Sequence, residues 1–155
     1  MTDIRLVLHN IRSAYNVGAI LRTAECAGVS MVYLTGYTPD PIDRFGRSRK
    51  DIAKAALGAE SVVRWTHVDD TARCILELKR EGVRTVALEQ HPRSLSHHSY
   101  APPERMALVV GEEVRGIPEE LIGLCDDVIE IPLLGTKESL NVSVATGIAL
   151  FRLIE

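Results

Sequence analysis

The sequence predicts an α/β fold in which a mainly parallel sheet carries helices on both faces. Short apolar runs rich in β-branched residues alternate with segments of helical periodicity, as in chains that build such a sheet. One run, Met106–Val110, is apolar throughout, which is typical of a central parallel strand covered on both sides. The chain has 155 residues, 46% of them hydrophobic and 25% charged. We therefore expect a single domain over residues 1–155.

Strands are expected at regular intervals along the chain. The predicted strands are Ile4–Leu8, Met31–Thr35, Val62–Trp65, Thr85–Glu89, Met106–Val110 and Val128–Ile131. The longest irregular stretches between them are Gly36–Ser48 and Gln90–Arg105. Loops of that length are more often functional than idle.

The helix after the first strand has one apolar stripe that should face the sheet. The stripe consists of Val17, Ile20, Leu21, Ala24 and Gly28. Asn16 is placed to cap the start of the helix. Arg22 lies off the stripe and over Gly18, near the positive end of the helix, which leaves room for an anion. A surface salt bridge between Arg22 and Glu25 is the competing interpretation.

The last helix, expected over Leu140–Ile154 with Ser139 placed to cap it, has two apolar faces. One face carries Val142, Ala145, Ala149 and Leu153, and the other carries Val144, Ile148 and Phe151. A helix that is apolar on two sides must be covered twice. In a chain this short the second cover is expected to be another subunit, so we predict a homodimer.

The bulk properties exclude several classes of protein. No apolar run approaches the roughly 18 residues of a membrane span, and the first ten residues lack the layout of a signal peptide, so we expect a soluble, cytoplasmic protein. Cys26, Cys74 and Cys125 are expected to be reduced core thiols. The spacing of the histidines fits no tight metal geometry, and no metal site is predicted.

A local basic patch is the expected contact for a polyanion, because the formal net charge of −3 gives no global attraction. The patch, set against Asp43 and Asp51 alone, consists of Arg44, Arg47, Arg49, Lys50 and Lys54. A solvated surface run is the alternative interpretation.

Three segments combine glycines, polar residues and strand ends, where parallel sheets bind ligands. They are Asn10–Arg22, Val110–Pro118 and Ile131–Ser143. The first lacks the G-x-G-x-x-G spacing of a dinucleotide site, but its helix start with Arg12 and Arg22 suits a phosphate.

Together these segments resemble the SpoU (TrmH-like) family of SPOUT RNA methyltransferases. Residues Asn16–Arg22 are similar to the family's first motif and Gly111–Gly116 to its second. Ile131 and Pro132 with Ser139–Ser143 are similar to the third. The resemblance implies S-adenosylmethionine-dependent methylation of a ribose 2′-hydroxyl in RNA. It also implies a C-terminal trefoil knot and a dimer packed through the terminal helices.

The resemblance further implies the roles of individual residues. The implied cofactor pocket is lined by Leu88, Glu89, Gly111, Ile131, Leu133, Ser139 and Leu140. The residues implied to surround the acceptor ribose are Asn16, Arg22, Glu113, Ser139 and Asn141. Arg22 is expected to clamp a substrate phosphate; a role as base stays open, but a free guanidinium is a poor base.

The second motif departs from the family's usual form, with Glu112 where Asn is common and Val114 where Gly is common. Many relatives carry an N-terminal RNA-binding extension that this sequence does not show, so RNA affinity is expected from the catalytic domain. Compact relatives include tRNA methyltransferases, which makes tRNA the first expected substrate and ribosomal RNA the second. A non-catalytic RNA-binding module of the same fold is the alternative.

Overall fold

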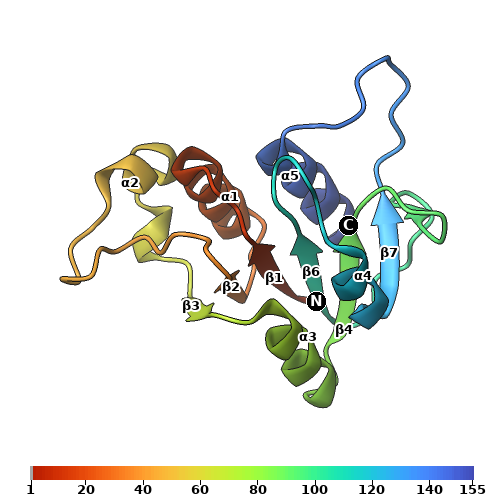
Figure 1. Ribbon diagram of the computed structural model, residues 1–155, viewed down its shortest axis with the longest axis horizontal. Helices are drawn as coiled ribbons and strands as arrows, with labels where there is room; N and C mark the ends of the chain where they lie inside the picture. Colours follow the sequence, from red (N-terminus) through yellow and green to blue (C-terminus); the bar gives the residue numbers. More distant parts are fainter. Residues whose placement is uncertain (1) are drawn as a thin grey trace.

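The computed structural model describes residues 2–155 and is built on one seven-stranded sheet. Neighbouring strands are all parallel, in the order β3-β2-β1-β6-β4-β7-β5. The strands are β1 (Asp3–His9), β2 (Met31–Thr35), β3 (Trp65–Val68), β4 (Arg84–Leu88), β5 (Leu95–Ser96), β6 (Arg105–Val110) and β7 (Asp127–Glu130). Their carboxyl ends lie at one edge, the upper edge in Figure 1. The predicted parallel α/β architecture is confirmed.

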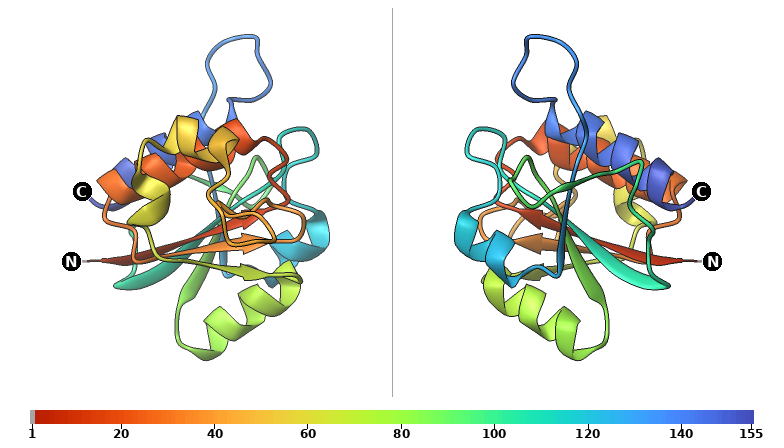
Figure 2. Two further views of the ribbon diagram at one scale, coloured as in Figure 1. Left: turned by 90° about the vertical axis from the view of Figure 1, so that its left-hand side faces the viewer. Right: turned by 90° about the vertical axis from the view of Figure 1, so that its right-hand side faces the viewer.

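Helices cover both faces of the sheet. The helices are α1 (Ala14–Cys26), α2 (Lys50–Ala56), α3 (Thr71–Arg80), α4 (Glu119–Leu124) and α5 (Val142–Leu153), with a short 3₁₀ helix η1 (Ala59–Ser61). Figure 2 shows α1, α2 and α5 above the sheet and α3 below it. The helix α4 packs with α3, since Leu121 and Ile122 share a core cluster with Ile75 and Leu78.

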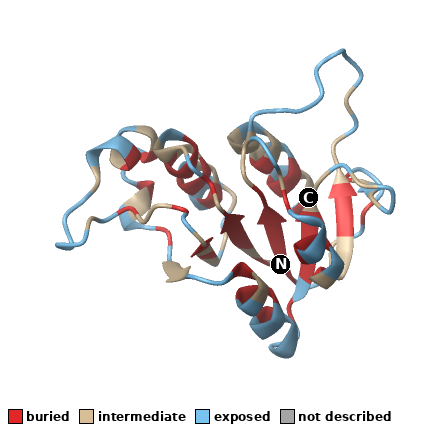
Figure 3. Ribbon diagram, viewed as in Figure 1, coloured by how far each residue is buried: buried red, intermediate tan, exposed pale blue. Residues whose placement is uncertain are grey.

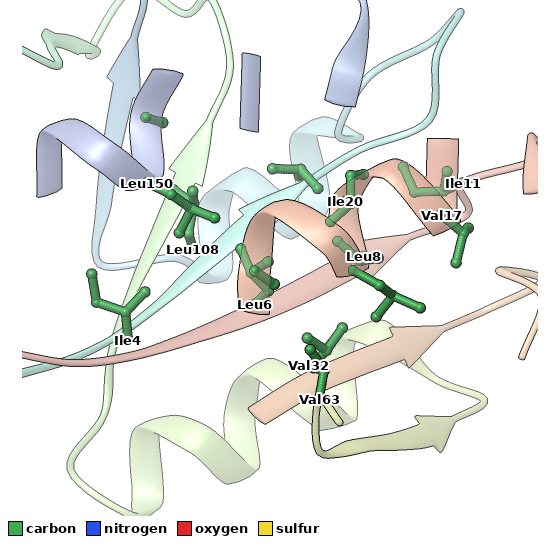
Figure 4. Packing of buried hydrophobic residues seen from close by; sticks show 14 of the residues in the cluster. Ile4, Leu6, Leu8, Ile11, Val17, Ile20, Val32, Val63, Leu108 and Leu150 are labelled. Carbon is green, nitrogen blue, oxygen red and sulfur yellow. The ribbon is translucent and has the colours of Figure 1, made fainter. Parts of the chain in front are cut away.

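Successive side chains of β1 point to opposite faces of the sheet and so contribute to the core on both sides. Leu6 and Leu8 pack into the cluster beneath α1 and α5, whereas Val7 between them packs into the cluster with α3 and α4. Figure 4 shows the first cluster, which includes Leu6 of β1, Leu108 of β6 and Leu150 of α5. The central strands β1 and β6 are accordingly buried over most of their length (Figure 3).

One predicted strand was wrong. The segment Val62–Trp65 follows η1, and the strand begins at Trp65 and runs to Val68. Val63 is buried from a position outside the sheet, so its apolar character marks packing against the core rather than a strand. The two-residue strand β5 was not predicted.

Both helix caps differ from the sequence interpretation. Ser13 caps α1 by accepting a hydrogen bond from the Asn16 backbone N–H at 3.2 Å, and Asn16 itself is buried within the helix. The helix also ends before Gly28, whose φ of +72° belongs to the turn that follows. Asn141, rather than Ser139, caps α5.

The cysteines, a membrane span, a metal site and the knot were the remaining subjects of the sequence predictions. Cys74 and Cys125 are buried free thiols, but Cys26 is exposed at the end of α1, which corrects its assignment to the core. Residues 2–155 contain no helix long and apolar enough to cross a membrane and no cluster of three or more metal-ligating side chains. The trefoil knot stays a prediction.

Candidate functional site

A cavity lies at the carboxyl-end edge of the sheet, where segments distant in sequence meet. Its walls come from the end of β4, the loop after β6, the end of β7 and the start of α5. The lining residues are Leu88, Glu89, Gln90, Val110, Gly111, Glu112, Glu113, Val114, Arg115, Gly116, Glu130, Ile131, Leu133, Ser139, Leu140, Val142 and Ala145.

Every residue expected to hold the cofactor lines this cavity. They are Leu88, Glu89, Gly111, Ile131, Leu133, Ser139 and Leu140. Two further lining residues, Gln90 and Glu130, were not singled out from the sequence. Gln90 directly follows Glu89, and Glu130 directly precedes Ile131. Val142 and Ala145 were assigned only to an apolar face of the last helix, yet both reach the cavity from α5.

The loop after β6 folds back tightly on itself, and two glycines make this possible. A Cβ on Gly111 would lie 2.5 Å from the carbonyl carbon of Gly116, far inside van der Waals contact. Gly116 has a φ of +66°, and its N–H donates to the Glu112 carbonyl at 2.9 Å. Glu89 supports the loop from β4, since its Oε2 accepts the Ile117 N–H at 3.0 Å.

The two unusual residues of the second motif are accommodated in this loop. Val114 is 83% exposed and meets no steric barrier. Glu112 accepts hydrogen bonds from the Arg115 backbone N–H at 3.3 Å and from the Tyr37 hydroxyl at 3.2 Å. Tyr37 belongs to the segment after β2, so its hydroxyl links that segment to the cavity wall. No sequence pattern pointed to this contact.

A long loop between β7 and α5 projects beyond the carboxyl-end edge of the sheet (Figures 1 and 2). It carries the lining residues Leu133, Ser139 and Leu140, while Leu134 is fully exposed. The Gln90 amide donates to the carbonyl oxygen of Glu138 at 2.8 Å and so fastens the loop to the end of β4.

The charge of the cavity lining is predominantly negative. Its lining includes the four glutamates Glu89, Glu112, Glu113 and Glu130 but a single basic residue, Arg115. The rest of the wall is formed by glycines and aliphatic residues with few other polar groups. Such a lining disfavours a phosphate group and suits a ligand that carries positive charge.

A hydrogen-bonded network borders the cavity and joins the three motifs. Glu113 accepts from the backbone N–H groups of Arg12 and Ser13 and from the Asn16 side-chain amide, each at 3.2 Å. The Asn141 amide donates to Asn16 Oδ1 at 3.3 Å. Asn16, Glu113 and Asn141, all expected around the acceptor ribose, are therefore assembled in one place.

The Glu113 carboxylate is held in its ionised form. Burial raises the pKa of Glu113, but hydrogen bonds from its own backbone, from Asn16 and from the N–H groups of Ser13 and Arg12 outweigh burial and lower the pKa below its usual value. An anion with a lowered pKa is a weak proton acceptor. The arrangement thus favours a positioning role for Glu113 within the network.

Arg22 is not brought to this network within the chain. It is exposed, does not line the cavity, and makes no ion pair with Glu25 within residues 2–155. It lies about 120° around the axis of α1 from Asn16, since successive helical residues turn by about 100°.

The expected anion space above Gly18 is absent. A Cβ on Gly18 would collide with the carbonyl oxygen of Ile52 and with Ala55, because α2 packs directly against α1. The glycine permits close helix packing instead. Local patterns did not indicate this packing, because the helix α2 was not predicted from the sequence.

The predicted RNA-binding residues lie at exposed or half-buried positions, but two of them are paired. Arg49 makes a bidentate contact with Asp51 at 3.1 and 2.6 Å, and Arg47 lies 3.3 Å from Asp43. The remaining predicted cations, which have no ion pair within residues 2–155, are Arg12, Arg44, Lys50 and Lys54.

Comparison with known proteins gives a consistent relationship over nearly the whole chain. A model of the SpoU rRNA Methylase family matches residues 3–151. A 23S rRNA (guanosine-2′-O-)-methyltransferase, RlmB from Salmonella typhi, is 36% identical over 149 residues, covering 96% of this chain and 58% of the relative. The chain thus spans less than two thirds of the length of the curated relatives it matches first.

Solved structures show the same fold. An AdoMet-bound rRNA methyltransferase from Sinorhizobium meliloti superposes with a TM-score of 0.86 at 27% identity, covering 97% of this chain and 55% of that one. A structure described as giving insights into the 2-OH methylation of C/U34 on tRNA has a TM-score of 0.82 and 28% identity, covering 98% of this chain and 94% of that one.

Proposed function

The chain belongs to the SpoU rRNA methylase family, and we propose that it transfers a methyl group from S-adenosylmethionine to a ribose 2′-hydroxyl of RNA. One observation carries the proposal: Glu113 lines the cavity and also belongs to the polar network with Asn16 and Asn141. A cofactor and an acceptor held in these two places would be neighbours.

The cavity fits S-adenosylmethionine on chemical grounds. This cofactor carries a positively charged sulfur and no phosphate, which matches a wall of four glutamates and one arginine. The apolar side chains of Leu88, Ile131 and Leu140 suit an adenine ring, and Gly111 adds a wall without a side chain. When bound, S-adenosylmethionine supplies an electrophilic methyl group.

The network next to the cavity would orient the acceptor ribose. Glu113 fixes the Asn16 amide, and the Asn16 oxygen in turn fixes the Asn141 amide, so neither asparagine is free to rotate. Ser139 lies nearby on the cavity wall. Groups held in this way reduce the entropy lost when a substrate is positioned.

Arg22 is proposed to act on the substrate RNA, as a phosphate clamp. Its exposed guanidinium, which has no ion pair among residues 2–155, is available for a phosphate. Arg22 does not reach the cavity of its own chain, so this role depends on how RNA or a second subunit approaches α1.

We propose a homodimer, supported by an uncovered apolar face on α5. Val144, Ile148 and Phe151 are 51%, 40% and 45% exposed, respectively, while Ala149 and Leu153 on the other face are buried. Light scattering at micromolar concentration tests this, with Ile148→Glu as the variant expected to dissociate the dimer. A wild-type monomer would contradict the proposal.

Transfer of labelled methyl groups tests the activity and the class of RNA together. Purified protein is incubated with labelled S-adenosylmethionine and either tRNA or ribosomal RNA, and 2′-O-methyl sites are mapped in the product. The relatives point to both RNA classes: RlmB is a 23S rRNA enzyme, and a structure of similar length concerns tRNA. Binding of both RNA and cofactor without transfer to either RNA would favour the non-catalytic RNA-binding module.

A further inference from the structure

A short turn between β2 and α2 presents an aromatic ring to solvent together with two arginines. We call residues Asp43–Arg47 the Phe45 turn. Phe45 is 65% exposed, which is unusual because phenylalanine side chains are mostly buried in folded proteins. The guanidinium carbons of Arg44 and Arg47 lie 4.8 and 5.0 Å from the centre of its ring.

The turn has a defined conformation. One carboxylate oxygen of Asp43 accepts the backbone N–H groups of Phe45 at 2.8 Å and Arg47 at 3.0 Å. The Asp43 N–H donates to the Arg47 carbonyl at 2.7 Å, and Gly46 supplies the positive φ, +76°, that closes the turn. The ring is therefore held outward by the backbone, although it has few packing contacts.

The location of the turn separates it from the cavity. The segment between β2 and α2 extends to the left end of the molecule in Figure 1, and its outer part is exposed in Figure 3. The cavity involves β4, β6 and β7, on the other side of β1 in the sheet order. A ligand on the turn would thus be separate from a ligand in the cavity.

We propose that the Phe45 turn binds an unpaired nucleotide of the substrate RNA, with the base stacked on Phe45 and the neighbouring phosphates held by Arg44 and Arg47. This inference rests on the proposed function and adds a second contact with RNA, away from the methylated ribose. An aromatic face flanked by cations is the combination that single-stranded nucleic acid requires.

The chemistry of the turn favours RNA over a protein or membrane partner. A lone ring surrounded by cations offers little of the continuous apolar area that protein interfaces and membranes need. Arg44 and Arg47 are exposed, so either guanidinium can leave the ring for a phosphate without giving up buried contacts. Arg44 has no ion pair within residues 2–155, and Arg47 would exchange a surface ion pair with Asp43 for the phosphate. Lys50 and Lys54 follow on α2 and extend the same positive charge.

Fluorescence anisotropy with two RNA probes tests the stacking contact. The probes are a labelled single strand of about 12 nucleotides and a blunt duplex of the same sequence. Phe45→Leu should weaken binding of the single strand by about tenfold while leaving its salt dependence unchanged, because stacking releases no counterions. Duplex binding should hardly change. Phe45→Trp should retain the affinity for the single strand.

Control variants separate stacking from charge and from damage to the fold. Arg44→Gln with Arg47→Gln should flatten the salt dependence, whereas Arg80→Gln, an exposed arginine on α3, should not. The thermal midpoint of Phe45→Leu should match that of the wild type, since the ring is mostly exposed.

The outcomes distinguish this inference from the proposed function. Unchanged single-strand affinity in Phe45→Leu, or an equal loss with the duplex, overturns the stacking role while methyl transfer by the wild type still upholds the function. A wild-type protein that neither binds nor methylates RNA overturns both.

Discussion

The cavity and the Phe45 turn are built in opposite ways, in keeping with the opposite charges of the two ligands proposed for them. The cavity is acidic, partly enclosed and assembled from strand ends far apart in the sequence. The Phe45 turn is basic, exposed and formed by five consecutive residues around Asp43. A small cationic cofactor needs enclosure by several segments, whereas a polyanion can be met by a local surface.

The largest expected effect comes from a residue that belongs to neither region. Arg22→Ala should reduce methyl transfer by about 100- to 1000-fold, or about 3–4 kcal/mol, because the variant removes the charged group proposed to hold a substrate phosphate. Cofactor affinity and RNA binding at the Phe45 turn should remain. Single-turnover transfer of labelled methyl measures the reduction, and Arg22→Lys should recover little. Near-normal turnover in Arg22→Ala would remove Arg22 from the mechanism.

A glycine substitution should disturb the cavity alone. In Gly111→Ala the new methyl group collides with the backbone of Gly116, and the loop after β6 must shift. Overpacking of this kind costs about 1–3 kcal/mol, which corresponds to roughly five- to 150-fold in cofactor affinity. Calorimetry with S-adenosylmethionine gives the affinity. Gly123→Ala on α4 is the matched control, because its Cβ would meet nothing within 4 Å; an equal loss there would show a general effect on stability.

Removing cations should disturb RNA binding alone, and the ion pairs predict which cations matter. The affinity of the protein for RNA falls as salt rises, and changing Arg44, Lys50 and Lys54 to Gln should make this fall less steep. The slope of log affinity against log salt should shrink in magnitude by roughly 0.7–0.9 for each phosphate that is no longer neutralised. Arg49→Gln should have less effect than Lys50→Gln, because Arg49 is already held by Asp51. RNA affinity measured over a range of salt concentrations checks both statements. If the wild type and the triple variant showed equal salt dependence of RNA affinity, the basic patch would be a solvated surface that does not bind RNA.

The smallest expected effect is on pH dependence at the network. The folded-state pKa of Glu113 is lowered, so its contribution to stability is present above the ordinary value of 4.5 and is lost as pH falls through the lower folded value. Between neutral pH and about pH 3, the thermal midpoint of the wild type should fall more than that of Glu113→Gln, with the difference appearing below about pH 5. The difference should be at most on the order of 2 °C in a domain of this size, because solvent screens a partly exposed carboxylate. Parallel curves for the two proteins would show that Glu113 is not held as an anion.

Local patterns predicted most of the fold. Met31–Thr35 is a strand over those same residues, and the apolar run Met106–Val110 lies at the centre of the sheet. Where two local patterns competed, the sequence was ambiguous. Ser13 and Asn16 both suit a cap, and α1 begins after the earlier of the two, so that Asn16 is buried within its first turn.

Long-range contacts limited what could be predicted about the site. The resemblance grouped Asn16 with Asn141, and the two amides do meet although they are 125 residues apart in sequence. The hydrogen bond between Tyr37 and Glu112 had no such guide, because Tyr37 lies in an irregular loop without periodicity. Gly18 was misinterpreted for a related reason: its neighbour across the helix, α2, was not anticipated.

The hydrogen bond from Tyr37 to Glu112 makes one segment part of both regions. Tyr37 precedes the Phe45 turn on the same connection between β2 and α2, and Glu112 lines the cavity. Thermodynamic linkage then imposes reciprocity: the factor by which bound RNA changes cofactor affinity must equal the factor by which the cofactor changes RNA affinity. Two titrations, each performed with and without the other ligand, should therefore give one and the same coupling constant, and Tyr37→Phe should move that constant towards unity.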